Sequence, residues 1–141
     1  MEEFWGEYEF TLDDRGRVSV PADFRHRFAE GAMLTMNGDG CVELYTEEGY
    51  REMVKDVAAK PRTTPEGRQA RREFYGQSFG AELDRQGRIL IPQKLRLKAD
   101  LQGPVLIQGN LECFEIWDPE RKELHDAKAK VASSTEQASE G

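Results

Sequence analysis

Aspartate and arginine recur at one spacing in two places, and these residues are the best candidates for chemistry. Arg17 follows Asp13 by four positions, and Arg88 follows Asp84 by four, with a glycine directly before each arginine. An arginine held beside a tight turn can donate two hydrogen bonds to a guanine edge or to a phosphate. It can instead pair with its own aspartate and lock the turn. The residues alone leave both interpretations open.

The two turns carry a further arginine each, at different positions. Arg15 stands directly before Gly16, whereas Gln86 stands directly before Gly87 and Arg85 lies one residue earlier. The turns are therefore not equivalent, and the first has the stronger pair of arginines near its glycine. The candidate DNA-contacting residues are the aspartates and arginines of both turns: Asp13, Arg15, Arg17, Asp84, Arg85 and Arg88.

The residue types give little support to enzymatic or metal chemistry. The only histidines, His26 and His125, lie among charged residues and are expected to be inert surface groups. No zinc-binding, nucleophile-elbow or phosphate-loop pattern occurs in the sequence. Asp13 and Asp84 could be imagined as a catalytic carboxylate pair, but a role in the turn explains them without catalysis. We therefore expect no enzyme, no cofactor, no metal and no small-molecule substrate.

The two turns belong to a longer internal repeat. The segment LDDRGRVSVP at residues 12–21 returns as LDRQGRILIP at residues 83–92, and CVELY at residues 41–45 returns as CFEIW at residues 113–117. The offsets are 71 and 72 residues, so the two copies differ by a one-residue insertion or deletion between the blocks. This pattern indicates a duplicated unit. Because half of the chain would be marginally stable alone, we expect the two units to pack on each other.

Both units show the same predicted order of elements. Alternating apolar residues precede each turn and β-branched residues follow it, which is typical of two strands. A proline then ends the second strand and suits the start of a short helix. A further strand pair, and a helix capped by Thr46 or by Asp118, complete each unit. On the last helix, Leu124, Ala127 and Val131 are expected to point inward.

The repeat also sets the predicted domain boundaries. Residues 4–59 and 78–131 are expected to form the two units, residues 60–77 a linker helix, and residues 132–141 a disordered tail. The net charge is −7, yet residues 60–98 carry ten basic against four acidic residues, so a basic face is possible. Three linker arginines stand together, and we favour a contact with a neighbouring subunit for them over a phosphate contact: Arg68, Arg71 and Arg72.

The composition favours a soluble, cytoplasmic protein. No apolar run approaches the ~20 residues that cross a bilayer, and the acidic start Met-Glu-Glu is not followed by a signal-peptide core. Cys41 and Cys113 form neither a disulfide framework nor a zinc motif, so we expect buried, reduced thiols.

Several motifs together resemble the MraZ family. They are Phe4-Trp5-Gly6, the two Leu-Asp-x-x-Gly-Arg-x-x-x-Pro blocks, the RREFYG segment at residues 71–76 and the FEIW segment at residues 114–117, in the right order over about residues 4–131. The resemblance implies an α+β, mainly β fold. In that fold two AbrB-like swapped-hairpin units form a pseudo-dimeric β-barrel with short helices.

The resemblance also implies a function. Members of the family are sequence-specific DNA-binding transcriptional regulators that assemble into closed homo-oligomeric rings, octamers or similar. They repress their own division and cell-wall gene cluster through tandem G-rich promoter repeats, in the cytoplasm at the nucleoid and away from membranes. The family's DNA-contacting Asp-x-x-x-Arg motif maps onto Asp13 with Arg17 and onto Asp84 with Arg88. The alternative is a ring that binds partner proteins or serves as a structural assembly, with no role on DNA.

Overall fold

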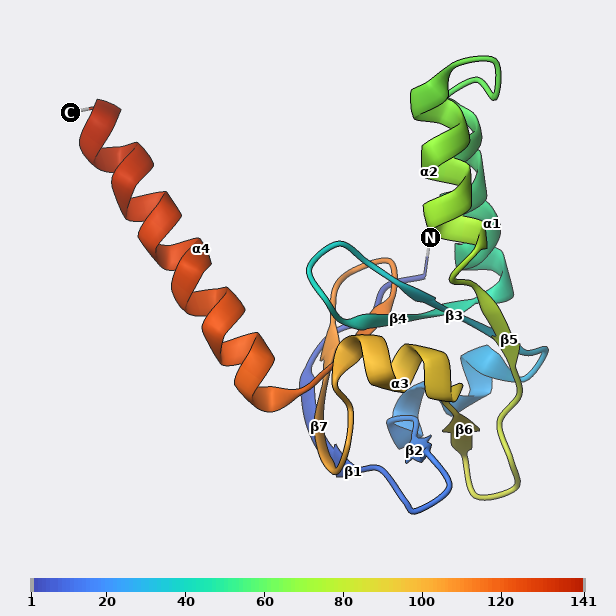
Figure 1. The fold of residues 1–141 in the computed structure, drawn as a ribbon. Helices are drawn as coiled ribbons and strands as arrows, with labels where there is room; N and C mark the ends of the chain where they lie inside the picture. Colours follow the sequence, from blue (N-terminus) through green and yellow to red (C-terminus); the bar gives the residue numbers. More distant parts are fainter. Residues whose placement is uncertain (1, 141) are drawn as a thin grey trace.

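The computed structural model describes residues 2–140, with only the backbone described for residues 135–140. The strands are β1 (Glu7–Thr11), β2 (Arg17–Ser19), β3 (Ala32–Met36), β4 (Val42–Thr46), β5 (Phe79–Ala81), β6 (Arg88–Leu90), β7 (Pro104–Gly109) and β8 (Phe114–Trp117). The helices are the 3₁₀ helix η1 (Ala22–Phe28) and the α-helices α1 (Glu47–Ala58), α2 (Pro65–Tyr75), α3 (Gln93–Ala99) and α4 (Pro119–Glu140). Figure 1 shows the arrangement of these elements.

The strands of the two repeats are interlaced. A six-stranded antiparallel sheet has the order β1-β7-β8-β4-β3-β5, and β2 pairs with β6 in a separate two-stranded sheet. Four of the six pairings join a strand of one repeat to a strand of the other, as swapped hairpins require. Between residues 2 and 140 no strand pairing joins the edge strands β1 and β5, so the larger sheet is open. Its closure into a barrel stays a prediction.

Equivalent residues of the two repeats face each other on the two central pairings. Val18 of β2 pairs with Ile89 of β6, and Glu43 of β4 pairs with Glu115 of β8. The two residues of each pair hold the same position in their own repeats. An approximate twofold axis that relates the two repeats therefore passes through both pairings. This symmetry places corresponding features of the two repeats side by side.

One apolar core lies between the sheets and the short helices that follow the prolines. Phe24 and Phe28 of η1 are buried, as are Leu95 and Ala99 of α3, so each short helix packs two residues four positions apart into the core. Phe4, ahead of β1, adds an aromatic ring to this core, with its centroid 5.0 Å from that of Phe114. The core therefore draws on both repeats and needs both of them.

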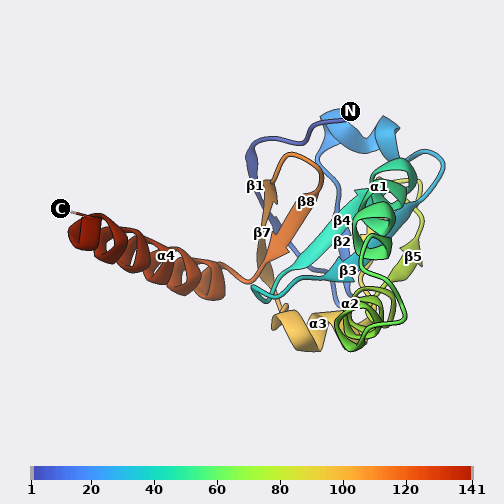
Figure 2. The ribbon, with the colours of Figure 1, turned by 90° about the horizontal axis from the view of Figure 1, so that it is seen from above.

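Two helical arms extend from the body: the α1–α2 pair rises on the side away from the β1–β2 and β5–β6 turns, and α4 leaves the flank beside β7 (Figures 1 and 2). One arm is the antiparallel pair α1–α2, whose helices are capped by Thr46 and Thr64; each of these hydroxyls accepts the backbone N–H three residues on. Tyr50 of α1 stacks on Phe74 of α2 with ring centroids 5.1 Å apart. The predicted linker helix is thus part of a hairpin with the last helix of the first repeat.

The second arm, α4, leaves the body and does not bury its apolar residues. Leu124 and Val131 are 65% and 67% exposed, and Ala127 is exposed too. The expectation that these residues point inward is therefore wrong for the single chain. The first turn of α4 is anchored to the body, because Arg121 donates to the carbonyl oxygens of Gly40 and Lys98.

Helix α4 also differs from the sequence prediction in its length. It continues to Glu140, so residues 132–140 are helical where a disordered tail was predicted, and residue 141 lies outside the described residues. The physical reason lies in the composition. Residues 120–140 contain no proline or glycine, and they include several alanines, glutamates and lysines, which are among the best helix formers. None of the helices described for residues 2–140 has the length and apolar character needed to cross a membrane.

A buried polar cluster lies on the outer face of the sheet, where β4 and β8 pair. Glu43 faces Glu115, and the Glu43 carboxylate accepts hydrogen bonds from the Tyr45 hydroxyl at 3.1 Å and from the Cys113 thiol at 3.8 Å. Burial raises the pKa of the Glu43 carboxyl, and the facing Glu115 adds to the rise. Cys41 and Cys113 are both buried free thiols, as predicted, and burial raises the pKa of each.

Replacing Glu43 by glutamine is expected to flatten the pH dependence of stability. Because the folded-state pKa is raised, the unfolded chain releases this proton at a lower pH than the folded protein does. The stability that the carboxyl confers is present below its ordinary pKa of about 4.3 and is lost as the pH rises through the folded-state value. Denaturant unfolding between about pH 4 and pH 8 measures the slope.

Glutamine keeps an acceptor for Tyr45 but does not titrate, so the variant isolates the charge of Glu43. The control is Glu9→Gln, which removes an exposed carboxyl from β1. If the Glu43→Gln and wild-type stabilities change in parallel with pH, the ionisation of Glu43 is not linked to folding.

Candidate nucleic-acid interface

Each repeat forms a tight turn that is held by its aspartate; we call residues 13–17 the first tip and residues 84–88 the second tip. Asp13 Oδ1 accepts the backbone N–H groups of Arg15 and Arg17, both at 2.9 Å. Gly16 has a φ of +83°, which favours glycine, and its N–H donates to the Asp13 carbonyl oxygen. The second tip repeats each of these bonds. The turn role predicted for Asp13 and Asp84 is confirmed.

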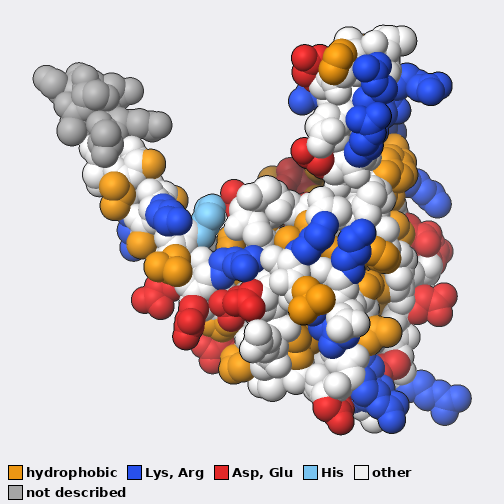
Figure 3. Space-filling model, in the orientation of Figure 1, with side chains coloured by type: hydrophobic (Ala, Val, Ile, Leu, Met, Phe, Trp, Pro, Cys, Tyr) orange, Lys and Arg blue, Asp and Glu red, His pale blue; other side chains and the backbone are white. Residues whose placement is uncertain are grey.

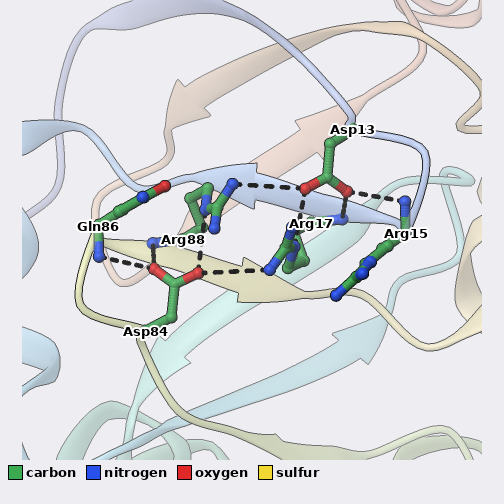
Figure 4. Close-up of polar contacts among 6 residues, drawn as sticks. All are labelled: Asp13, Arg15, Arg17, Asp84, Gln86 and Arg88. Atoms are coloured by element: carbon green, nitrogen blue, oxygen red, sulfur yellow. Dashed lines mark hydrogen bonds and ion pairs between the residues drawn. The ribbon is translucent and has the colours of Figure 1, made fainter.

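The β2–β6 pairing brings the two tips together into a quartet of alternating charges (Figure 4). Arg17 Nε lies 2.7 Å from Asp13 Oδ2, and Arg88 Nε lies 2.9 Å from Asp84 Oδ2. Longer pairs cross between the repeats: Arg17 Nη1 to Asp84 Oδ2 at 3.9 Å and Arg88 Nη1 to Asp13 Oδ2 at 3.6 Å. The arginines thus lock both the turns and the junction of the two repeats.

The quartet keeps its charges at neutral pH. The backbone N–H of Arg17 donates to Asp13 and is the main cause that lowers the pKa of this carboxyl to about 2, with help from the Arg17 guanidinium. The backbone N–H of Arg88 lowers the pKa of Asp84 in the same way. Both carboxylates therefore remain ionised and hold the guanidinium groups in fixed orientations.

The quartet does not bury the arginines. The side chains of Arg17 and Arg88 are 28% and 26% exposed. Among residues 2–134, the Nη2 nitrogen of each has no hydrogen bond or ion pair, so each guanidinium keeps one donor nitrogen for a ligand. Arg15 and Arg85 are exposed, and neither side chain has an ion-pair partner among the side chains the structure describes.

Sequence reasoning missed two arginines that the fold adds to the tips. Arg96 of α3 packs against Gly16 of the first tip, and Arg25 of η1 packs against Gly87 of the second. Each arginine thus serves the tip of the other repeat. A signal was present in the sequence, because Arg25 and Arg96 are equivalent residues of the repeat at the same offset of 71.

The two tips also differ in charge. Besides the difference between Arg15 and Gln86, the residue before each of these positions differs. Asp14 of the first tip corresponds to Arg85 of the second, so the additional arginine of the first tip is offset by an additional acid. The second tip therefore carries the larger positive charge. The predicted advantage of the first tip has no electrostatic basis once Asp14 is counted.

The linker arginines lie far from the tips, on the α1–α2 arm (Figures 1 and 3). Arg71 donates to the carbonyl oxygens of Ala58 and Lys60, and Arg68 donates to that of Arg62. They stabilise the connection between α1 and α2, a role that the sequence did not suggest. The predicted contact of Arg68, Arg71 and Arg72 with a neighbouring subunit stays a prediction.

The described part of the chain contains no group of three or more histidine, cysteine, aspartate or glutamate side chains placed to hold a metal ion. The Asp13 and Asp84 carboxylates, which could be imagined as a catalytic pair, both accept hydrogen bonds from their own turns and ion pairs from arginines. The arrangement is suited to presenting positive hydrogen-bond donors at fixed positions, which is the chemistry of nucleic-acid contacts.

Comparison with known proteins identifies the family. The family model described as "MraZ protein, putative antitoxin-like" matches twice, over residues 4–73 and 74–141. A transcriptional regulator MraZ of Roseiflexus castenholzii is 42% identical over 118 residues, which cover 84% of this chain and 82% of the relative. Those of Ligilactobacillus salivarius and Heliobacterium modesticaldum are 38% and 36% identical, over 90% and 97% of this chain and 89% and 94% of their own lengths.

The chain belongs to the MraZ family. Each of the two matches to the MraZ model contains one tip, so the family's own unit coincides with the internal repeat. In this MraZ chain the unit does not fold as a separate body, because the strands of one copy pair with those of the other. The tips of both copies therefore meet in a single surface.

Proposed function

We propose that this protein is a sequence-specific DNA-binding transcriptional regulator that contacts DNA with its two tips. The observation that carries the proposal is the β2–β6 pairing: the two Asp-x-x-x-Arg turns lie at the two ends of one short antiparallel ladder, and their aspartates and arginines meet between them (Figure 4). Two arginine-bearing turns in one surface offer donors to base edges and to phosphates at once. The names of the relatives, transcriptional regulators, agree with this role.

The ion pairs of the quartet prepare the arginines for this contact. Asp13 and Asp84 hold the two guanidinium planes so that little side-chain freedom is lost on binding. The pairs that cross between the repeats are long and partly exposed, and ion pairs of that kind contribute only about 0–1 kcal/mol. Exchanging them for the O6 and N7 acceptors of guanine therefore costs little.

The regulator acts as a closed ring of identical chains, an octamer or similar. A head-to-tail contact between two unlike surfaces generates a ring when it closes. The two surfaces proposed for this contact are the groove beside α4 and the α1–α2 arm. The apolar residues of α4 lie exposed in the single chain, and the charged residues that line the groove between α4 and β1–β7 are four acids and two lysines: Glu7, Glu9, Lys122, Glu123, Asp126 and Lys130. The α1–α2 arm carries the basic linker arginines on the opposite side of the body (Figure 3). These acidic and basic surfaces are complementary.

A ring multiplies the weak contact of a single pair of tips. Once one subunit is bound, its neighbours meet the next repeats at a high effective concentration. Repeats spaced by one helical turn, ~10 bp, present their sites on the same side of the duplex. The proposed targets are tandem G-rich repeats in the promoter of the protein's own division and cell-wall gene cluster. The protein represses the cluster by occupying them, in the cytoplasm at the nucleoid.

Binding to DNA from directly upstream of the protein's own gene tests this function. The expected result is tight binding of tandem G-rich repeats, weaker binding of a single repeat, and much weaker binding of a scrambled duplex. The affinity is expected to fall linearly with salt on a logarithmic plot, because phosphate contacts release counterions. Fluorescence anisotropy across a salt series measures these quantities. Equal binding of repeats and scrambled DNA would favour the alternative of an assembly that binds partner proteins.

A further inference from the structure

We infer that Arg25 and Arg96 are phosphate-contacting residues, each of which completes the DNA-binding tip of the other repeat. The inference rests on the proposed function and adds two positions that the Asp-x-x-x-Arg motif does not include. It makes each DNA contact a composite of both repeats.

The backbone explains why each arginine reaches the opposite tip. Beyond β2 the chain runs beside the second tip, where the Val20 N–H donates to the Gly87 carbonyl oxygen at 2.9 Å. Beyond β6 it runs beside the first tip in the same way, with Ile91 donating to Gly16 at 3.0 Å. The proline that follows starts η1 or α3, and that helix carries its arginine over the neighbouring glycine.

Each guanidinium lies directly against a glycine. A β-carbon at Gly16 would lie 2.7 Å from Arg96 Nε, and one at Gly87 would lie 2.5 Å from Arg25 Cδ. Any other residue at either glycine would displace the arginine. The glycines therefore serve the turn through their positive φ and also make room for a cation from the other repeat.

Within the described residues, no carboxylate neutralises Arg25 or Arg96. Arg25 donates through Nε to the Val20 carbonyl oxygen at 2.9 Å, which fixes the side chain and leaves its two Nη nitrogens available. Arg96 Nε is buried and has no hydrogen-bond partner. Over residues 2–134, neither arginine is paired with a carboxylate, in contrast to Arg17 and Arg88.

This contrast suggests a division of roles within the surface. The quartet holds the central arginines in defined planes, as base-edge contacts require. The unpaired arginines beside the glycines are half-buried and positioned, and a phosphate is the group that such a guanidinium pairs with in a duplex. An arginine lies against the glycine at both tips, so this contact is a feature of the repeat unit and not of one tip alone.

The test compares the double variant Arg25→Gln, Arg96→Gln with the wild type in the same salt series. Glutamine removes the charge but keeps part of the length and one amide NH₂ donor group. The expected result is a loss of affinity of about tenfold or more and a salt slope smaller in magnitude by about 0.9 for each phosphate that is no longer neutralised. Because phosphates carry no sequence information, repeat and scrambled DNA are expected to lose affinity by the same factor.

Two further variants separate a phosphate contact from a structural role. Arg25→Lys with Arg96→Lys keeps the charges and is expected to restore the salt slope. Arg51→Gln removes an exposed arginine of α1, far from the tips, and is expected to change nothing. A glutamine variant with the wild-type slope would overturn the inference while the proposed function stood. A wild-type protein that fails to bind the repeats would overturn the proposed function itself.

Discussion

Replacing Arg17 by alanine is expected to lower the affinity for tandem G-rich repeats by roughly tenfold to a hundredfold, and Arg88→Ala by a similar factor. A bidentate arginine–guanine contact contributes about 1–3 kcal/mol of discrimination. The loss is compounded when several subunits bind one promoter, since every tip is weakened together. Mobility-shift or anisotropy titrations against repeat and scrambled DNA measure both affinity and discrimination.

The charge-matched control for this experiment is Arg51→Ala, which removes an arginine from an exposed ion pair on α1. Arg17→Lys keeps the charge but loses the planar pair of donors, so it is expected to bind DNA with little preference for the repeats. The tips are partly exposed turns, and thermal unfolding of each variant checks that the fold is kept. Wild-type binding by both Arg17→Ala and Arg88→Ala would show that the arginines only lock the turns.

Replacing Gly109 by alanine is expected to destabilise the fold by about 3 kcal/mol, through the loss of Phe4 from the core. The Gly109 N–H donates to the Gly6 carbonyl oxygen at 2.8 Å, and a β-carbon at this position would lie 2.5 Å from the carbonyl carbon of Phe4. That neighbour is backbone and cannot rotate away. The segment before β1 must move out, and the buried ring of Phe4 moves with it.

A matched glycine and a double mutant make this prediction specific. Gly103→Ala adds the same methyl group where no atom lies within 4 Å, so it is expected to change stability by less than about 0.5 kcal/mol. Phe4→Ala removes the ring directly, and combining it with Gly109→Ala is expected to cost clearly less than the sum of the two. Denaturant unfolding gives all four values. A Gly109→Ala protein as stable as the Gly103→Ala protein would refute the proposed clash.

The sequence left two interpretations of the repeated arginines open: a contact with nucleic acid, or an ion pair that locks the turn. In the structure the two are compatible. The pairing of Arg17 with Asp13 and of Arg88 with Asp84 is present, together with cross-repeat pairs at longer distances. The same arginines keep about a quarter of their side chains exposed and one nitrogen free, so pairing within the chain does not prevent a contact with DNA. Both roles can belong to one side chain because guanidinium has five donors.

The sequence by itself was sufficient for the local structure and for the family. The duplicated Leu-Asp-x-x-Gly-Arg blocks predicted the turns, the strands beside them and the helices after the prolines, because these depend on residues within a few positions of each other. The apolar face of α4 was predicted to be buried for the same local reason. It lies exposed, because burial depends on what packs against a helix and not on its own periodicity.

Only the tertiary structure decided how the repeats share their parts. The pairing of β2 with β6, the charge quartet and the crossing of Arg25 and Arg96 to the opposite tips join residues about 70 positions apart. No spacing within one repeat distinguishes a strand that pairs inside its own unit from one that pairs with the other unit. That choice is made when both copies bury a common core, and it assembles the candidate DNA surface from both halves of the chain.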